Sequence, residues 1–183
     1  MTMSKLKTCG LAVVAIAFSA CGPGQEGAEQ TVSGAELGQL EAKVTKAISG
    51  TTCVVEATDP YKYDSGPYAN MISAQASVWD CEEEYPIIYV CSILEKKSVS
   101  STGTVTWTAV PGSRSCYPET NTDFGGQTAT PTAYSAGVYR QRAQAAIKLN
   151  ATTWTPAQPS TCSTLANDVP CVFTSVVSAN TPL

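Results

Sequence analysis

The fold is decided by Tyr85-Pro86-Ile87-Ile88-Tyr89-Val90-Cys91-Ser92-Ile93-Leu94. Isoleucine, valine and tyrosine make up most of this stretch, and such side chains favour extended backbone. We therefore predict a strong strand over residues 85–94. The preceding segment, residues 68–81, fits either a helix or a strand by the spacing of its apolar residues. We favour a strand from Ile72 onward, because a hairpin with residues 85–94 then brings Cys81 close to Cys91.

Other segments favour strands more simply. Residues 104–110 place Val105, Trp107 and Ala109 on one face and threonines on the other, which is the two-residue period of a strand. Pro, Gly and Asn concentrate in two further segments, where we predict loops. The remaining predictions are strands at residues 51–57 and 171–177 and loops at residues 117–132 and 150–170.

Two segments are predicted as helices. In residues 33–49, Ser33 and Glu36 form a capping box, and Gly50 ends the segment. Residues 133–149 form the second predicted helix, which carries basic residues on its polar side. The order of elements predicts an α+β fold, with an antiparallel β-sheet, an N-terminal helix and a second helix. The apolar face of the first helix comprises Leu37, Leu40, Val44, Ala47 and Ile48.

The first 20 residues have the layout of a secretory signal. Lys5 and Lys7 form a short positive region, and an apolar core over residues 11–18 is followed by small residues. This core is much shorter than the roughly 20 residues of a membrane-spanning helix. Phe18-Ser19-Ala20-Cys21 resembles the lipobox of bacterial lipoprotein precursors. The resemblance implies cleavage before Cys21, acylation of its thiol and attachment to a lipid bilayer. The alternative interpretation is ordinary secretion with cleavage after Ala20.

These features divide the chain into three parts. Residues 1–20 are the predicted signal peptide, and residues 21–32 are a lipid-anchored flexible tether that lacks an apolar run. Residues 33–183 form one globular α+β domain, which is a typical domain length. Gly22, in place of Asp, follows the cysteine. By analogy with the lipoprotein sorting rule, this implies delivery to the outer membrane.

Six cysteines fall in the predicted domain. An even number in an exported chain indicates a disulfide framework, here three bridges. The short loops favour the pairs Cys81–Cys91 and Cys162–Cys171, which leaves Cys53–Cys116. There is no Cys-x-x-Cys motif and no histidine, so no metal site and no cofactor are predicted. The six residues are Cys53, Cys81, Cys91, Cys116, Cys162 and Cys171.

Charge narrows the range of partners. The mature chain would keep nine of the 11 Lys and Arg residues against 15 Asp and Glu, a net charge of −6. Such a surface argues against a nucleic-acid partner. The absence of histidine excludes Ser-His-Asp and Cys-His catalytic sites, so an enzyme would depend on carboxylates, Lys or Tyr.

Asp59, Tyr61, Tyr63 and Asp64 are the candidate ligand-binding residues. Aromatic rings beside carboxylates bind carbohydrate or peptide in many exported proteins. The alternative is that these rings pack at the rim of a small sheet. An acidic cluster over residues 80–84 favours a solvated turn, and an acidic loop over residues 119–126 departs from the calcium-binding EF-hand pattern.

The function that the sequence predicts is that of a membrane-anchored, non-catalytic structural or binding module. Its expected partners are a lipid bilayer, reached through acylated Cys21, and an envelope polymer or protein. The alternative is a hydrolase of envelope polymers that uses carboxylates such as Glu83 and Asp123.

Overall fold

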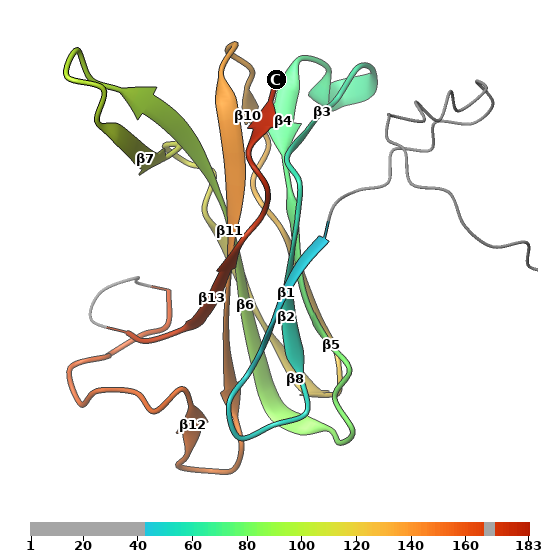
Figure 1. The fold of residues 1–183 in the computed structure, drawn as a ribbon. Helices are drawn as coiled ribbons and strands as arrows, with labels where there is room; N and C mark the ends of the chain where they lie inside the picture. Colours follow the sequence, from blue (N-terminus) through green and yellow to red (C-terminus); the bar gives the residue numbers. More distant parts are fainter. Residues whose placement is uncertain (1–42, 167–170) are drawn as a thin grey trace, which may run out of the picture. The chain divides into compact units, whose positions relative to one another are not determined.

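The computed structural model describes residues 43–166 and 171–183 (Figure 1). These residues form an all-β structure, in which the one helical element of the described ranges is a short 3₁₀ turn at Gly66–Tyr68. No helix in the described ranges has the length and apolar character needed to cross a bilayer. The predictions for Cys21, the signal peptide and the tether concern residues outside the described ones.

The larger sheet is built around β6 (Tyr85–Val99), and we call it the β6 sheet. One edge of β6 pairs with β11 (Val138–Lys148), and the other pairs with β8 (Ser115–Thr122) and then β7 (Val105–Ala109). All of these pairs are antiparallel. The far edge of β11 pairs with three short strands, which are β12 (Trp154–Thr155), β13 (Thr174–Val177) and β14 (Thr181–Pro182).

The second sheet, which we call the β5 sheet, is also antiparallel. Its strand order is β1-β2-β5-β9, and a three-stranded sheet of order β10-β4-β3 adjoins it along the chain. β3 follows β2, β4 precedes β5 and β10 follows β9, so the short strands continue the longer ones. The bounds are β1 (Lys43–Ala47), β2 (Val54–Thr58), β3 (Tyr61–Lys62), β4 (Met71–Ser73), β5 (Gln75–Trp79), β9 (Gly125–Thr128) and β10 (Thr132–Ala133).

The two sheets pack face to face as a β-sandwich around an apolar core. Alternate residues of each strand point inward, so small and branched side chains from both sheets interdigitate. A Cβ built on Gly125 would lie 2.8 Å from a methyl carbon of Ile88 and 2.9 Å from one of Val90, which shows how closely β9 approaches β6. The core includes Val55, Ala57, Ala76 and Val78 from the β5 sheet and Ile88, Val90, Ala143, Ala145 and Ile147 from the β6 sheet.

The prediction of an α+β fold is wrong, because both segments predicted as helices form strands where they are described. Residues 138–148 form β11, and ten of its residues pair with β6, from Tyr139 to Lys148. Its alanines favour a helix locally, but the long pairing with β6 outweighs that preference. Residues 43–47 form the edge strand β1, while residues 33–42 lie outside the described residues.

The other predictions divide between confirmed and wrong. The strands predicted near residues 51–57, 72–81, 85–94, 104–110 and 171–177 are confirmed, within a few residues at their ends. The loop predicted at residues 117–132 is wrong, because it holds most of β8 and all of β9. The predicted hairpin between β5 and β6 is also wrong. β5 pairs with β2 and β9, so the turn after β5 carries the chain across to the other sheet.

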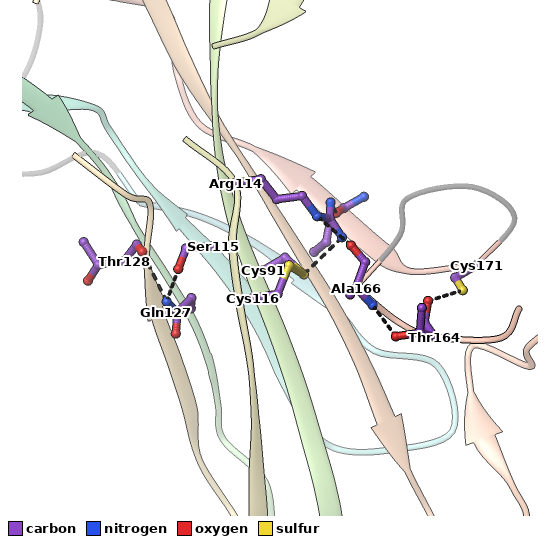
Figure 2. Close-up of a disulfide and its surroundings, with 10 residues drawn as sticks. Cys91, Arg114, Ser115, Cys116, Gln127, Thr128, Thr164, Ala166 and Cys171 are labelled. Atoms are coloured by element: carbon purple, nitrogen blue, oxygen red, sulfur yellow. Dashed lines mark hydrogen bonds between the residues drawn. A yellow bond between two sulfur atoms is a disulfide. The ribbon is translucent and has the colours of Figure 1, made fainter. Parts of the chain in front are cut away.

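Three disulfides join the six domain cysteines, which confirms the predicted framework. The pair Cys162–Cys171 is confirmed. The other two predicted pairs are wrong, because β5 does not form a hairpin with β6. Cys91 instead lies opposite Cys116 on β6 and β8, with their Cα atoms 4.1 Å apart (Figure 2). Cys53 and Cys81 close the ends of the paired strands β2 and β5.

Candidate functional site

The outer face of the β5 sheet carries two large exposed aromatic side chains. Val55 and Val78 point into the core, so strand alternation turns Glu56, Ser77 and Trp79 outward. Trp79 is 40% exposed at the end of β5, and Phe124 is 52% exposed just before β9. Exposed large aromatic groups on one sheet face are typical of a binding surface.

The strand register places these rings around a shallow floor. Ser77 lies between Glu56 on β2 and Gly126 on β9, so two small residues occupy neighbouring positions. The ring of Phe124 folds back toward this row, because a Cβ built on Gly126 would lie 3.4 Å from its Cε1 atom. Any larger residue at position 126 would meet the ring. The small side chains at these two positions therefore leave open space between the aromatic groups.

Glu56 fixes the orientation of Trp79. The Trp79 indole Nε1 donates a hydrogen bond of 3.1 Å to Glu56 Oε2, and the Lys43 amine lies 3.2 Å from Glu56 Oε1. The Glu56 side chain is only 8% exposed, whereas that of Lys43 is 55% exposed. A carboxylate with both oxygens bonded holds the indole in one position, while the lysine remains accessible to a ligand.

These five residues line a cavity of about 350 Å³. They are Lys43, Glu56, Ser77, Trp79 and Phe124. Such a site offers two ring faces for stacking, a hydroxyl group, a carboxylate and an amine. This combination suits a ligand with apolar C–H faces and many hydroxyl groups. Glycoside hydrolysis by the usual route needs a pair of carboxyl groups, and among the described residues that line this cavity Glu56 is the only acidic one.

The candidate residues predicted from sequence lie elsewhere, around β3. The ring centroids of Tyr61 and Tyr63 are 5.2 Å apart, and those of Tyr63 and Tyr68 are 5.5 Å apart. The hydroxyl groups of Tyr61 and Tyr63 lie 3.2 Å apart, within hydrogen-bond distance. The structure therefore brings three tyrosines together, with their rings packed against one another. This arrangement stabilises the hairpin between β3 and β4.

The two predicted acidic partners differ in their surroundings. Asp64 is exposed, whereas Asp59 is half-buried. Asp59 Oδ1 is buried and has no hydrogen-bond partner among the residues that the structure describes. The ligand-binding role of Asp59, Tyr61, Tyr63 and Asp64 stays a prediction.

The acidic residues after β5 surround a different cavity, of about 500 Å³. Glu82 and Glu83 line it together with Tyr85 and residues 50–52. Burial raises the pKa of the Tyr85 phenol, and the adjacent Glu83 carboxylate raises it further. Asp123 is exposed in the turn between β8 and β9. Within residues 43–166 and 171–183, no three His, Cys, Asp or Glu side chains are grouped to hold a metal ion.

Sequence reasoning missed Glu56, Trp79 and Phe124 as site residues. The alternation in residues 75–79 carries a usable signal for Trp79, because an inward Val78 requires an outward tryptophan. Phe124 gives no comparable signal, since its position depends on β9 pairing with β5. No protein-family model matches the chain, and no curated protein or solved structure shows a significant match to it.

Proposed function

We propose that the chain is a non-catalytic binding module that holds a polysaccharide of the cell envelope on the outer face of the β5 sheet. The observation that carries this proposal is the cavity between Trp79 and Phe124, with Glu56 in its wall. The flat outer face of a sheet suits an extended polymer, because a chain of sugars can lie across several strands.

Each group in the cavity has a role in this proposal. The indole of Trp79 and the ring of Phe124 stack on the C–H faces of sugar rings. The Ser77 hydroxyl and the Lys43 amine supply hydrogen bonds to sugar hydroxyl groups. Glu56 acts as a positioning residue, since its bond to the indole keeps the stacking face in place before the ligand arrives.

The expected anchoring fits this role. Acylation of Cys21 and a flexible tether over residues 21–32 would hold the domain near a membrane, where it would meet envelope polymers repeatedly. Mass spectrometry of the mature N-terminus tests this part. We expect a diacylated or triacylated Cys21, and an unmodified Cys21 would contradict the anchoring.

Binding to purified envelope polysaccharide tests the site itself. We expect the parent chain to sediment with insoluble peptidoglycan or another envelope glycan, and a Trp79→Ala, Phe124→Ala double variant to bind at least about 10-fold more weakly. Tyr117→Ala is the matched control, because Tyr117 is 54% exposed on β8 of the other sheet.

Two results would contradict the proposal. One is a parent chain that binds none of the envelope glycans. The other is a double variant that binds as well as the Tyr117→Ala control. The competing hypothesis of a carboxylate hydrolase predicts release of soluble fragments from the same glycans, which the supernatant of this experiment would reveal.

A further inference from the structure

A third cavity is lined by residues of β6, β7, β10 and β11. At this end of the sandwich the hairpin of β6 and β7 diverges from β4 and β10 (Figure 1). The volume of the cavity is about 420 Å³. Cavities of roughly 300–1,000 Å³ commonly hold small molecules. The cavity is separate from the polysaccharide site, because its residues belong to β6, β7, β10, β11 and the segments that join them.

Much of the cavity wall is apolar. Val110, Pro111 and Ala133 contribute side chains, and Tyr139 contributes its ring. The Tyr139 hydroxyl donates a hydrogen bond of 2.6 Å to the Ser135 carbonyl oxygen, which satisfies its polar atom and leaves the ring to pack. Behind Tyr139 lies a buried apolar cluster that comprises Ile72, Ala74, Leu94 and Ala129.

Two neighbouring lysines, Lys96 and Lys97, line this cavity, and Lys96 is the one that contacts the Tyr139 ring. Lys96 lies between Thr108 and Tyr139 in the strand register, on the inward side of β6 two residues beyond Leu94. Its amine donates a hydrogen bond of 2.7 Å to Ser135 Oγ and lies 5.1 Å from the centroid of the Tyr139 ring. In the described part of the chain, Lys96 forms no ion pair with a carboxylate.

This geometry differs from that of the three basic residues that pair with buried carboxylates. Arg140 and Arg142 both pair with Glu95, and Lys43 pairs with Glu56. Lys96 is held in position by a neutral hydroxyl and an aromatic ring, so its charge stays uncompensated. An uncompensated amine at the mouth of an apolar cavity favours a ligand with one negative group and a hydrocarbon body.

We propose that this cavity binds a small amphipathic carboxylate, such as a medium-chain fatty acid. The carboxylate accepts a charge-assisted hydrogen bond from the Lys96 amine, and Ser98 and Thr108 also line the cavity. The hydrocarbon chain lies against Val110, Pro111 and the Tyr139 ring. Apolar contact supplies affinity, and Lys96 selects the charged head group.

Titration calorimetry of the full-length chain with decanoate tests the proposal. We expect saturable one-to-one binding, and about 10-fold or greater loss of affinity for decanol, which has the same tail without the charge. Lys96→Met should lose about 10-fold or more in affinity for decanoate. Lys148→Met is the matched control, because Lys148 lies over the Trp154 ring, away from this cavity.

Gly137→Ala provides a second variant that keeps the charge of Lys96. A Cβ at position 137 would lie 2.6 Å from Lys96 Cε, so the lysine side chain must shift from the position in which it bonds to Ser135. We expect weaker decanoate binding and a smaller preference for decanoate over decanol. The proposal is overturned if the parent chain does not bind decanoate, if decanol binds equally well, or if a folded Lys96→Met variant binds decanoate like the parent. If Lys96→Met does not fold, the comparison of decanoate with decanol on the parent decides.

Discussion

The outer faces of the two sheets differ in how many of their polar and aromatic side chains contact one another. On the β6 sheet, Arg140 and Arg142 form ion pairs with the buried Glu95 carboxylate, with N–O distances of 2.7 and 3.0 Å, and the Arg140 guanidinium lies 4.3 Å from the centroid of the Trp107 ring. On the β5 sheet, Trp79 and Phe124 flank an open cavity. The charged and aromatic side chains of the β6 sheet therefore contact one another, whereas those of the β5 sheet line a cavity that a ligand can enter.

The C-terminal segment adds to this closure of the β6 sheet. Arg114 donates hydrogen bonds to Gln144 Oε1 at 2.9 Å and to the Ala166 carbonyl oxygen at 3.2 Å, and it lies 3.4 Å from Cys91 Sγ (Figure 2). A single guanidinium thus ties the loop to both central strands of the sheet. The difference between the faces teaches that a sandwich of this size can devote one outer face to stability and the other to recognition.

The largest expected effect comes from the disulfide on the closed face. Replacing Cys91 and Cys116 with alanine should lower the free energy of unfolding by about 3.5 kcal/mol, since the bridge spans 25 residues of chain. The same change at Cys162 and Cys171, which lie nine residues apart, should cost about 2.5 kcal/mol. Urea unfolding of both double variants measures the two values. An equal or larger loss at Cys162 and Cys171 would contradict the dependence on loop length.

The next prediction compares the loss of stability when each of two buried carboxylates, Glu95 and Glu56, is neutralised. Glu95→Gln should cost about 3 kcal/mol, because it removes the charge of a buried carboxylate that pairs with two arginines whose side chains are only 24% and 26% exposed. Glu56→Gln should cost less, because Lys43, with which Glu56 forms its ion pair, is 55% exposed. Unfolding and polysaccharide binding should be measured on both variants. We expect Glu95→Gln to affect stability alone and Glu56→Gln to affect mainly binding, so the reverse pattern would remove the distinction between the faces.

A smaller effect is expected at Arg114. Arg114→Ala should lower the free energy of unfolding by about 1–2 kcal/mol, through loss of the hydrogen bonds to Gln144 and Ala166. It should also expose residues 157–166 to limited proteolysis. Arg114→Lys should show a similar loss, because a lysine lacks the fork that reaches several acceptors at once. Unchanged proteolysis of Arg114→Ala would show that the loop is held by other contacts.

The smallest expected effect is a dependence on alkaline pH at Tyr85. Burial, and then the Glu83 carboxylate, raise the pKa of this phenol in the folded chain. The contribution of Tyr85 to stability is therefore complete below the ordinary tyrosine pKa of about 10 and is lost as pH rises through the higher folded value. Tyr85→Phe should remove this part of the alkaline loss in unfolding measurements. An identical pH profile for parent and variant would contradict the assignment.

The sequence predicts the parts of the fold that depend on local pattern. The run of Ile and Val residues identifies β6, and the alternation around Trp107 identifies β7. β11 is not predicted in this way, because its alanines favour a helix locally. The segment forms a strand through its pairing with β6. The disulfide pairs depend on which sheet each strand joins, which spacing alone does not reveal.

The candidate site, likewise, depends on strand pairing and not on local sequence pattern. Tyrosines near β3 stand out in the sequence because they are close together along the chain, yet their rings mostly pack on one another. Glu56, Trp79 and Phe124 come from three separate segments that meet only through the register of β2, β5 and β9. A site assembled across strands in this way needs the three-dimensional structure to be recognised.

The most direct test of the open face is fluorescence from Trp79 alone. Replacing Trp107 and Trp154 with phenylalanine leaves Trp79 as the only tryptophan of the chain's three. Titrating this variant with soluble oligosaccharides from the envelope glycan that the parent chain binds should shift Trp79 emission to shorter wavelengths, because a stacked sugar excludes water from the indole. In the same background, Phe124→Ala should raise the dissociation constant obtained from this titration at least about 10-fold. Saturating oligosaccharide that leaves Trp79 emission unchanged would show that the outer face of the β5 sheet is not the binding surface.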